Sequence, residues 1–183
     1  MRKRFVHLFL PILVSLILVS LTIAPLIGCR NTVPEENTQR RLDACSLLSK
    51  EEVGDILNIQ FADPNRQIRK DDRGKIVMSS CTYVPTDGTS FASLNLLVTP
   101  RPNGGDPDRV IEEHVQSLRK AMGHTSFSPA RVDGVGAAAV HLPGLGQFVV
   151  FDKSRLLVLT LRRHSKESTK DVLTQLAKAS LSE

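Results

Sequence analysis

Three cysteines, Cys29, Cys45 and Cys81, carry the widest choice of chemistry in this 183-residue sequence. A cysteine thiolate can act as a nucleophile or bind a metal ion, and two cysteines can form a disulfide. The first two uses need partners close by, yet the sequence has no C-x-x-C pair and no cysteine beside a histidine. The five histidines are scattered, at positions 7, 114, 124, 141 and 164. Which of these uses the cysteines have therefore depends on whether the protein is exported to an oxidising compartment.

The first 28 residues are typical of a secretory signal peptide. Three basic residues at positions 2 to 4 precede an almost wholly apolar run from residue 5 to 27, and a small residue, Gly28, stands before Cys29. A transmembrane anchor is the alternative, because about 20 apolar residues can span a bilayer. Pro11 and Pro25 interrupt the run and favour a cleaved signal.

The segment Leu26-Ile27-Gly28-Cys29 resembles the lipobox of bacterial lipoproteins. In that family the cysteine is acylated and becomes the first residue after cleavage. The resemblance implies that Cys29 is a lipid attachment site and that the mature chain is anchored to the cell membrane or outer membrane. The domain would then face the periplasm or the exterior.

Export favours a disulfide between Cys45 and Cys81. Once Cys29 carries lipid, these are the two remaining cysteines, and two cysteines in an oxidising compartment most simply pair. Structural zinc sites need four ligands, usually in closely spaced pairs, and the sequence offers none. We therefore predict no metal and no cofactor.

The charge of the mature chain gives little attraction for nucleic acid. Three of the 24 basic residues and none of the 19 acidic residues lie in the signal peptide, which leaves 21 against 19 and a net charge of +2. The densest basic segment has interleaved aspartates and no aromatic residue, so it is a poor platform for bases. It is predicted to be an exposed loop or irregular edge strand, with a surface for an anionic partner as the alternative. Its basic residues are Arg66, Arg69, Lys70, Arg73 and Lys75.

Residues 43 to 57, DACSLLSKEEVGDIL, predict the entry to the first helix. Ser49 and Glu52 have the spacing of a capping box, and Leu48 and Val53 that of a hydrophobic staple. The helix is thus expected to begin at Ser49, with Cys45 in an extended lead-in. Residues 29 to 42 are predicted to be the lipidated cysteine and a polar tether, and residues 43 to 183 a single domain.

The remaining pattern predicts an α+β fold. Strands are expected at 75 to 84 and 90 to 99 around a turn at 85 to 88, and at 137 to 142, 146 to 151 and 155 to 161. A second helix should begin after an Asp106 cap and end at Gly123, and a third should follow a Ser165 cap. The prediction is an antiparallel sheet of about five to six strands with helices packed on one face.

The sequence contains one formal cofactor motif, GVGAAA at 134 to 139. A dinucleotide site needs a helix after these glycines, but a β-like run and Pro143 follow, so Gly134 and Gly136 are interpreted as turn glycines. The adjacent carboxylate pairs diverge on helix faces or lie in turns, and no G-x-S-x-G elbow is present.

The motifs DACSLLSKEEV, SSCTY and GVGAAA together resemble a family of uncharacterised bacterial lipoproteins common in actinobacteria. The resemblance spans residues 43 to 181, with Ala44 where proline is usual. It implies no catalytic residue. Some small exported lipoproteins of similar pattern have a fold like that of the photosystem accessory protein PsbP, an α/β/α sandwich.

We therefore expect a non-catalytic binding or accessory module of the cell envelope, whose partner is an envelope protein or a small ligand. One alternative is an envelope hydrolase or enzyme-assisting subunit with a site assembled from distant residues, such as Ser93, His114, Asp133 and His141. Another is a lipid-binding module with its ligand enclosed between sheet and helices.

Overall fold

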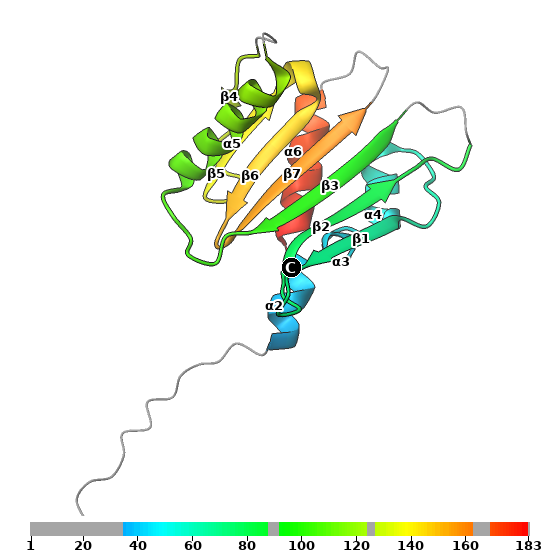
Figure 1. The fold of residues 1–183 in the computed structure, drawn as a ribbon. Helices are drawn as coiled ribbons and strands as arrows, with labels where there is room; N and C mark the ends of the chain where they lie inside the picture. The colour runs from blue at the N-terminus through cyan, green and yellow to red at the C-terminus, as the bar shows by residue number, and fades with distance from the viewer. Residues whose placement is uncertain (1–34, 88–91, 124–126, 163–168, 183) are drawn as a thin grey trace, which may run out of the picture. The chain divides into compact units, whose positions relative to one another are not determined.

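Seven strands form one antiparallel sheet in the order β1-β2-β3-β7-β6-β5-β4 (Figure 1). The structure, a computed structural model, describes residues 35–87, 92–123, 127–162 and 169–182. All of them lie in the unit Pro34–Glu183. The strands are β1 (Asn65–Lys70), β2 (Ile76–Tyr83), β3 (Ser93–Pro100), β4 (Ala130–Arg131), β5 (Ala138–Leu142), β6 (Gln147–Asp152) and β7 (Arg155–Arg162).

Five α-helices accompany the sheet in the described residues, so the fold is α+β as predicted. The sequence pattern found the long strands and α5, and the basic segment is indeed partly an edge strand, β1. The seventh strand, β4, is only two residues long and has no strand signal of its own. The helices are α2 (Glu35–Leu42), α3 (Ala44–Leu47), α4 (Lys50–Leu57), α5 (Pro107–Met122) and α6 (Thr169–Leu181), with a 3-10 turn η1 (Pro143–Leu145).

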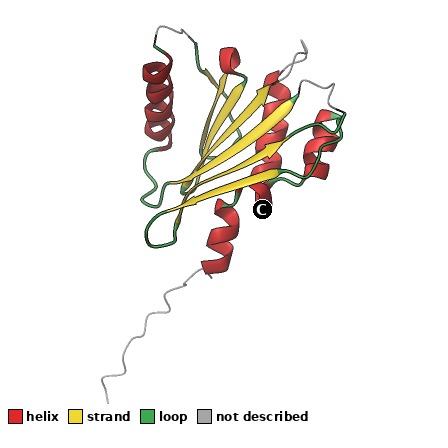
Figure 2. Ribbon diagram, turned by 45° about the vertical axis from the view of Figure 1, so that its right-hand side comes forward, coloured by secondary structure: helices red, strands yellow, loops and turns green. Residues whose placement is uncertain are grey.

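Helices pack on both faces of the sheet, whereas the sequence analysis placed them on one (Figure 2). The reason lies in β6, whose consecutive apolar residues point alternately to opposite faces and so require cover on both. Phe148 and Val150 belong to the core that includes α4 and α6. Val149 and Phe151 belong to a second core with α5.

The segment that leads into the first core differs from the prediction at Cys45 and agrees with it at the start of α4. Cys45 lies in the short helix α3 rather than in an extended segment, because Asp43 caps that turn and accepts a hydrogen bond from the Cys45 amide at 3.2 Å. The helix α4 follows the predicted capping box: the Glu52 amide donates to Ser49 Oγ at 3.1 Å, and the Ser49 amide donates to Glu52 Oε2 at 2.8 Å. Cys45 and Cys81 form the predicted disulfide, which ties α3 to β2.

Residues 35–42 form the helix α2, so the part of the predicted tether from residue 35 onward is not irregular. Arg40 and Arg41 stand in its last turn, where cations interact favourably with the helix dipole. The end of α2 is also held by the sheet. Arg155 Nη1 donates to the Arg41 carbonyl at 2.7 Å, and Ser79 Oγ donates to the Leu42 carbonyl at 2.6 Å.

Two sequence predictions fall partly outside the described residues. The Ser165 cap is one, although α6 itself is present and buries Leu173, Leu176 and Ser180 as expected. The turn at 85 to 88 is the other, and the strands that flank it, β2 and β3, do pair antiparallel.

The glycines of the GVG segment occupy a turn before β5, as predicted. Gly134 and Gly136 have φ values of 73° and 61°, which side-chain-bearing residues adopt only with strain. A Cβ on Gly134 would meet nothing within 4 Å, whereas a Cβ on Gly136 would meet Val150 Cγ1 at 2.6 Å and the Phe151 carbonyl oxygen at 2.7 Å. Gly136 is therefore needed for close contact with β6, not for binding phosphate.

The disulfide predicts a large loss of stability on its removal. Replacing Cys45 and Cys81 together by alanine should lower the free energy of unfolding by about 4 kcal/mol, because the bond restricts the unfolded chain. Equilibrium urea denaturation measures this change, and reduced wild-type protein should lose a similar amount. An unchanged urea midpoint in the double variant would show that the bond contributes nothing.

The different surroundings of Gly134 and Gly136 predict different losses of stability when each is replaced by alanine. In Gly134→Ala the only penalty is the positive φ of the backbone, which should lower the free energy of unfolding by about 1 kcal/mol. Gly136→Ala meets the same penalty and a collision with the β6 backbone, so it should cost several kcal/mol. Thermal denaturation of both variants tests this ranking, and equal losses would contradict the contact.

Candidate functional site

The structure does not assemble the distant-residue site that the hydrolase alternative requires. His114 lies on α5, and His141 lies on β5 with its ring near Phe148, in the opposite face. Asp133 is an exposed loop residue beside Arg131. Ser93 begins β3, which β7 and β6 separate from β5. At about 4.8 Å per strand, Ser93 and His141 are more than 10 Å apart.

Both histidines are better explained by packing. Their Nε2 atoms are buried and have no hydrogen-bond partner among the described residues. Burial lowers the pKa of His114 and of His141 below the usual value, and the nearby cations Arg101 and Lys170, respectively, lower it further. The folded chain therefore disfavours protonation of each imidazole relative to the unfolded chain.

In the described part of the chain the cysteines form a disulfide, and the carboxylates form no cluster that could hold a metal ion. Cys45 and Cys81 are bonded to each other, so neither is a free thiol. In the same residues, no group of three or more His, Cys, Asp or Glu side chains is placed to hold a metal ion. No helix among them is both long enough and apolar enough to cross a bilayer. Cys29, the predicted lipid site, lies outside the described residues.

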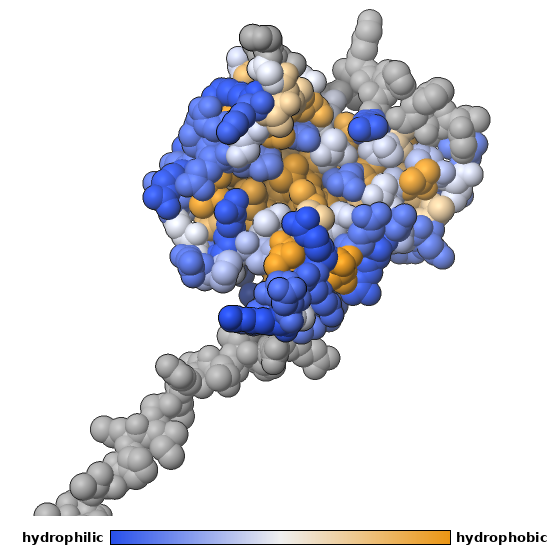
Figure 3. All heavy atoms as spheres, in the orientation of Figure 1, coloured by the Kyte–Doolittle hydropathy of each residue, from blue (hydrophilic) through white to orange (hydrophobic). Residues whose placement is uncertain are grey.

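The face of the sheet that carries α5 is only half covered. The helix α5 packs against β5 and β6, and its apolar side chains complete the second core there. Across β1, β2 and β3 the same face is open, and Met78 and Leu97 are only partly buried. Figure 3 shows this face, on which hydrophobic side chains (orange) lie beside α5 and polar side chains lie farther along the sheet.

A row of uncharged polar residues crosses five strands of this face. Each member is directly opposite the next in the strand register, so their side chains are neighbours. None carries a charge, although partly exposed sheet positions commonly do. From β1 to β6 the row reads Asn65, Thr82, Asn95, Thr160 and Gln147.

Four members of this row line a hollow of about 390 Å³, which we call the sheet hollow; Ser93 and Arg162, themselves directly opposite each other, complete it. Within it, Asn95 Nδ2 donates to Thr82 Oγ1 at 2.8 Å, which fixes the Asn95 amide. Gln147 Oε1 is buried and has no hydrogen-bond partner among the described residues. An unmet buried acceptor is costly unless water or a ligand satisfies it.

The sheet hollow lies at the opposite end of the sheet from α2. Arg155, which holds the end of α2, begins β7, and Arg162 ends it. Seven residue steps along a strand correspond to about 23 Å. In Figure 1, α2 meets the lower end of the sheet and β7 (orange) points to the upper end.

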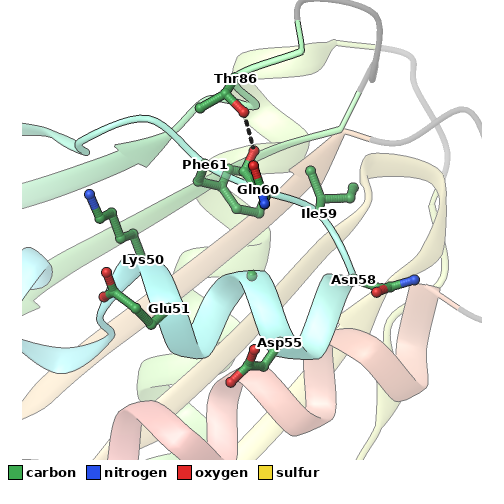
Figure 4. Close-up of a pocket in the computed structure, with 9 residues that line it drawn as sticks. Lys50, Glu51, Asp55, Asn58, Ile59, Gln60, Phe61 and Thr86 are labelled. Atoms are coloured by element: carbon green, nitrogen blue, oxygen red, sulfur yellow. Dashed lines mark hydrogen bonds between the residues drawn. The ribbon is translucent and has the colours of Figure 1, made fainter.

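A second hollow, of about 520 Å³, lies beside α4 (Figure 4). Two of its polar side chains have structural roles: Lys50 pairs with Asp63, and Thr86 Oγ1 donates to the Gln60 carbonyl at 3.3 Å. Its shape follows from the turn after α4, because a Cβ on Gly54 would lie 2.9 Å from the Ile59 carbonyl oxygen. We therefore favour the sheet hollow as the candidate site. Most of the residues that line each of these two hollows are polar, whereas a lipid-binding module needs a mainly apolar lining.

Sequence reasoning did not find the sheet hollow. Within each strand, Thr82, Asn95 and Thr160 alternate with apolar residues, which is the ordinary pattern of a half-exposed strand. Only the strand order, with β7 inserted between β3 and β6, brings them into one row. The signal that was available was the absence of charge at these positions.

Comparison with known proteins supplies no identity for this site: no protein-family model, no curated protein and no solved structure matches the chain.

The buried histidines predict a loss of stability in mild acid. The unfolded chain binds a proton on each imidazole near pH 6.5, but the folded state resists it, so unfolding takes up protons and stability falls as pH decreases through about 6.5. Urea denaturation at about pH 7.5 and pH 5.5 should show this loss. The double variant His114→Gln, His141→Gln should have a shallower pH dependence, and an unchanged slope would contradict the explanation.

Proposed function

We propose that the chain is a lipid-anchored lipoprotein of the bacterial cell envelope that acts as a non-catalytic binding module. The lipobox-like segment at 26 to 29 supports the anchor, and the disulfide supports an oxidising compartment. By the resemblance of its motifs, the chain would belong to the actinobacterial-type lipoproteins, with PsbP as an analogy for the fold.

The observation that carries the proposal is that the sheet hollow lies at the opposite end of the sheet from α2, the described segment nearest to Cys29 in the sequence. Six Cα steps separate Cys29 from the start of α2, which is at most about 20 Å of extended chain. The end of α2 is hydrogen-bonded to the sheet. An anchor on Cys29 would thus hold the α2 end near the bilayer, and the sheet hollow would face away from the membrane, accessible to an envelope protein or a small ligand.

The binding role is preferred to the hydrolase role because the residues proposed for catalysis lie on separate elements, while the described residues of the sheet hollow supply amide, hydroxyl and guanidinium groups and neither a carboxylate nor an imidazole. Such groups bind ligands well but supply no general base near neutral pH. The membrane partner in this proposal is contacted only through the lipid on Cys29.

The anchor predicts a defined N-terminal modification. Expressed in a bacterium with lipoprotein-processing enzymes, the full chain should be cleaved before Cys29 and should carry a diacylglycerol adduct there, as measured by intact mass and membrane fractionation. Cys29→Ala should lose both the cleavage and the adduct. Cys45→Ala is the matched control and should keep them. Retention of residues 1 to 28, or a mature chain without lipid, would overturn the proposal.

A further inference from the structure

We propose that the sheet hollow binds a small carboxylate that also carries hydroxyl or amide groups. The inference deepens the proposed function, on which it rests, by naming the class of ligand. Its strongest support is the combination of one buried acceptor, a set of hydroxyl and amide groups, and one cation at the edge of the same hollow.

The buried acceptor requires a donor from the ligand. Gln147 Oε1 has no partner among the described residues, and the one cation among the described lining residues, Arg162, lies two residues along β7 from the position opposite Gln147. A rotation of the Gln147 side chain toward the hollow would let a hydroxyl or N–H group of a ligand satisfy this oxygen.

The middle of the hollow can both donate and accept. Thr82 Oγ1 already accepts a hydrogen bond from Asn95, so its hydroxyl proton remains available to a ligand. Asn95 Oδ1 can accept, and the Thr160 hydroxyl can do either. This mixture suits a molecule with several hydroxyl or amide groups better than a purely apolar one.

The edge of the hollow selects for negative charge. Among the described residues of the lining Arg162 is the only charged one, and Ser93 lies directly opposite it on β3. A guanidinium and a neighbouring hydroxyl together form a good site for a carboxylate, because charge-assisted hydrogen bonds are about twice as strong as neutral ones. Without a carboxylate in the lining, a cationic ligand gains nothing.

The spacing fixes the size of the ligand. Arg162 and Thr160 are two residues apart on one strand, and Gln147 is opposite Thr160 on the next strand. The backbone positions of Arg162 and Gln147 are therefore about 8 Å apart. That distance and a hollow of about 390 Å³ fit a sugar acid or an acylated amino acid.

The test compares acids with their neutral counterparts. Three acids, D-glucuronate, N-acetyl-L-alanine and D-lactate, are titrated against the full mature chain in detergent micelles by ligand-observed NMR. Their counterparts are D-glucose, N-acetyl-L-alanine amide and propane-1,2-diol. We expect at least one acid to bind with a Kd in the millimolar range or below, and its counterpart to bind about tenfold more weakly.

Two variants locate the binding. Arg162→Gln should remove the preference for the acid, and Arg69→Gln, an exposed arginine at the far end of the same face on β1, is the matched control that should keep it. Gln147→Met should weaken binding about fivefold while leaving the free energy of unfolding unchanged or higher, because it removes an unmet buried acceptor. A purely structural Gln147 would give the opposite result.

The outcomes separate this inference from the proposed function. If none of the three acids binds, or if acid and counterpart bind equally, the ligand class is overturned even when Cys29 is shown to be lipidated. If the acids bind but Cys29 carries no lipid, the ligand class stands and the membrane anchor falls. Binding that survives both Arg162→Gln and Gln147→Met would place it elsewhere and also overturn the inference.

Discussion

The structure depends on one constraint: β6 and most of β7 are buried on both faces, and the described helices cover only one face of the sheet fully. Along β7 the first five residues are buried, so both sides of this strand need cover. The helices α3, α4 and α6 supply it on one face. On the other, α5 covers β5 and β6 and the remaining area stays open. The sheet hollow lies in this uncovered area, because the strands there carry polar rather than apolar side chains.

The same covering helices fix how the N-terminal segment enters the domain. Asp43 connects the parts: it caps α3, accepts from Ser46 Oγ at 2.9 Å and forms an ion pair with Arg66 of β1 at 2.7 Å. Ser79 of β2 accepts a hydrogen bond from the Ala44 amide at 2.8 Å and donates to the Leu42 carbonyl. Tyr83, fully buried, donates to the Leu48 carbonyl at 2.6 Å, and burial raises the pKa of its hydroxyl, which stays protonated. Polar groups at this junction are therefore satisfied by one another, and the direction of α2 is set by the sheet.

Much of the fold could be predicted because its signals are local. The capping box at Ser49 and Glu52, the Asp106 cap before Pro107, and the turn glycines Gly134 and Gly136 each depend on a few adjacent residues. The disulfide could be predicted because the expected lipidation of Cys29 leaves one pairing for the other two cysteines. The helices on both faces could not, because the apolar run in β6 is consistent with several arrangements. The candidate site was missed for a similar reason: Thr82, Thr160 and Gln147 come together only through strand order, which is a property of the whole chain.

The polar row is difficult to explain by stability alone. An apolar residue at Thr82, Asn95 or Thr160 would extend the second core toward β2, and a charged residue would favour solubility on an open face. Neutral amides and hydroxyls add little to the core and little to solubility. The buried Gln147 Oε1 also has a free-energy cost that the described residues do not offset. Positions that break the local rules of stability are where functional sites are expected. The second hollow, beside α4, has no buried unsatisfied side-chain atom among its described residues, and its glycine and its left-handed Asn58 are explained by the turn they form. This difference, rather than the volume of either hollow, is the reason to place the binding function on the open face of the sheet.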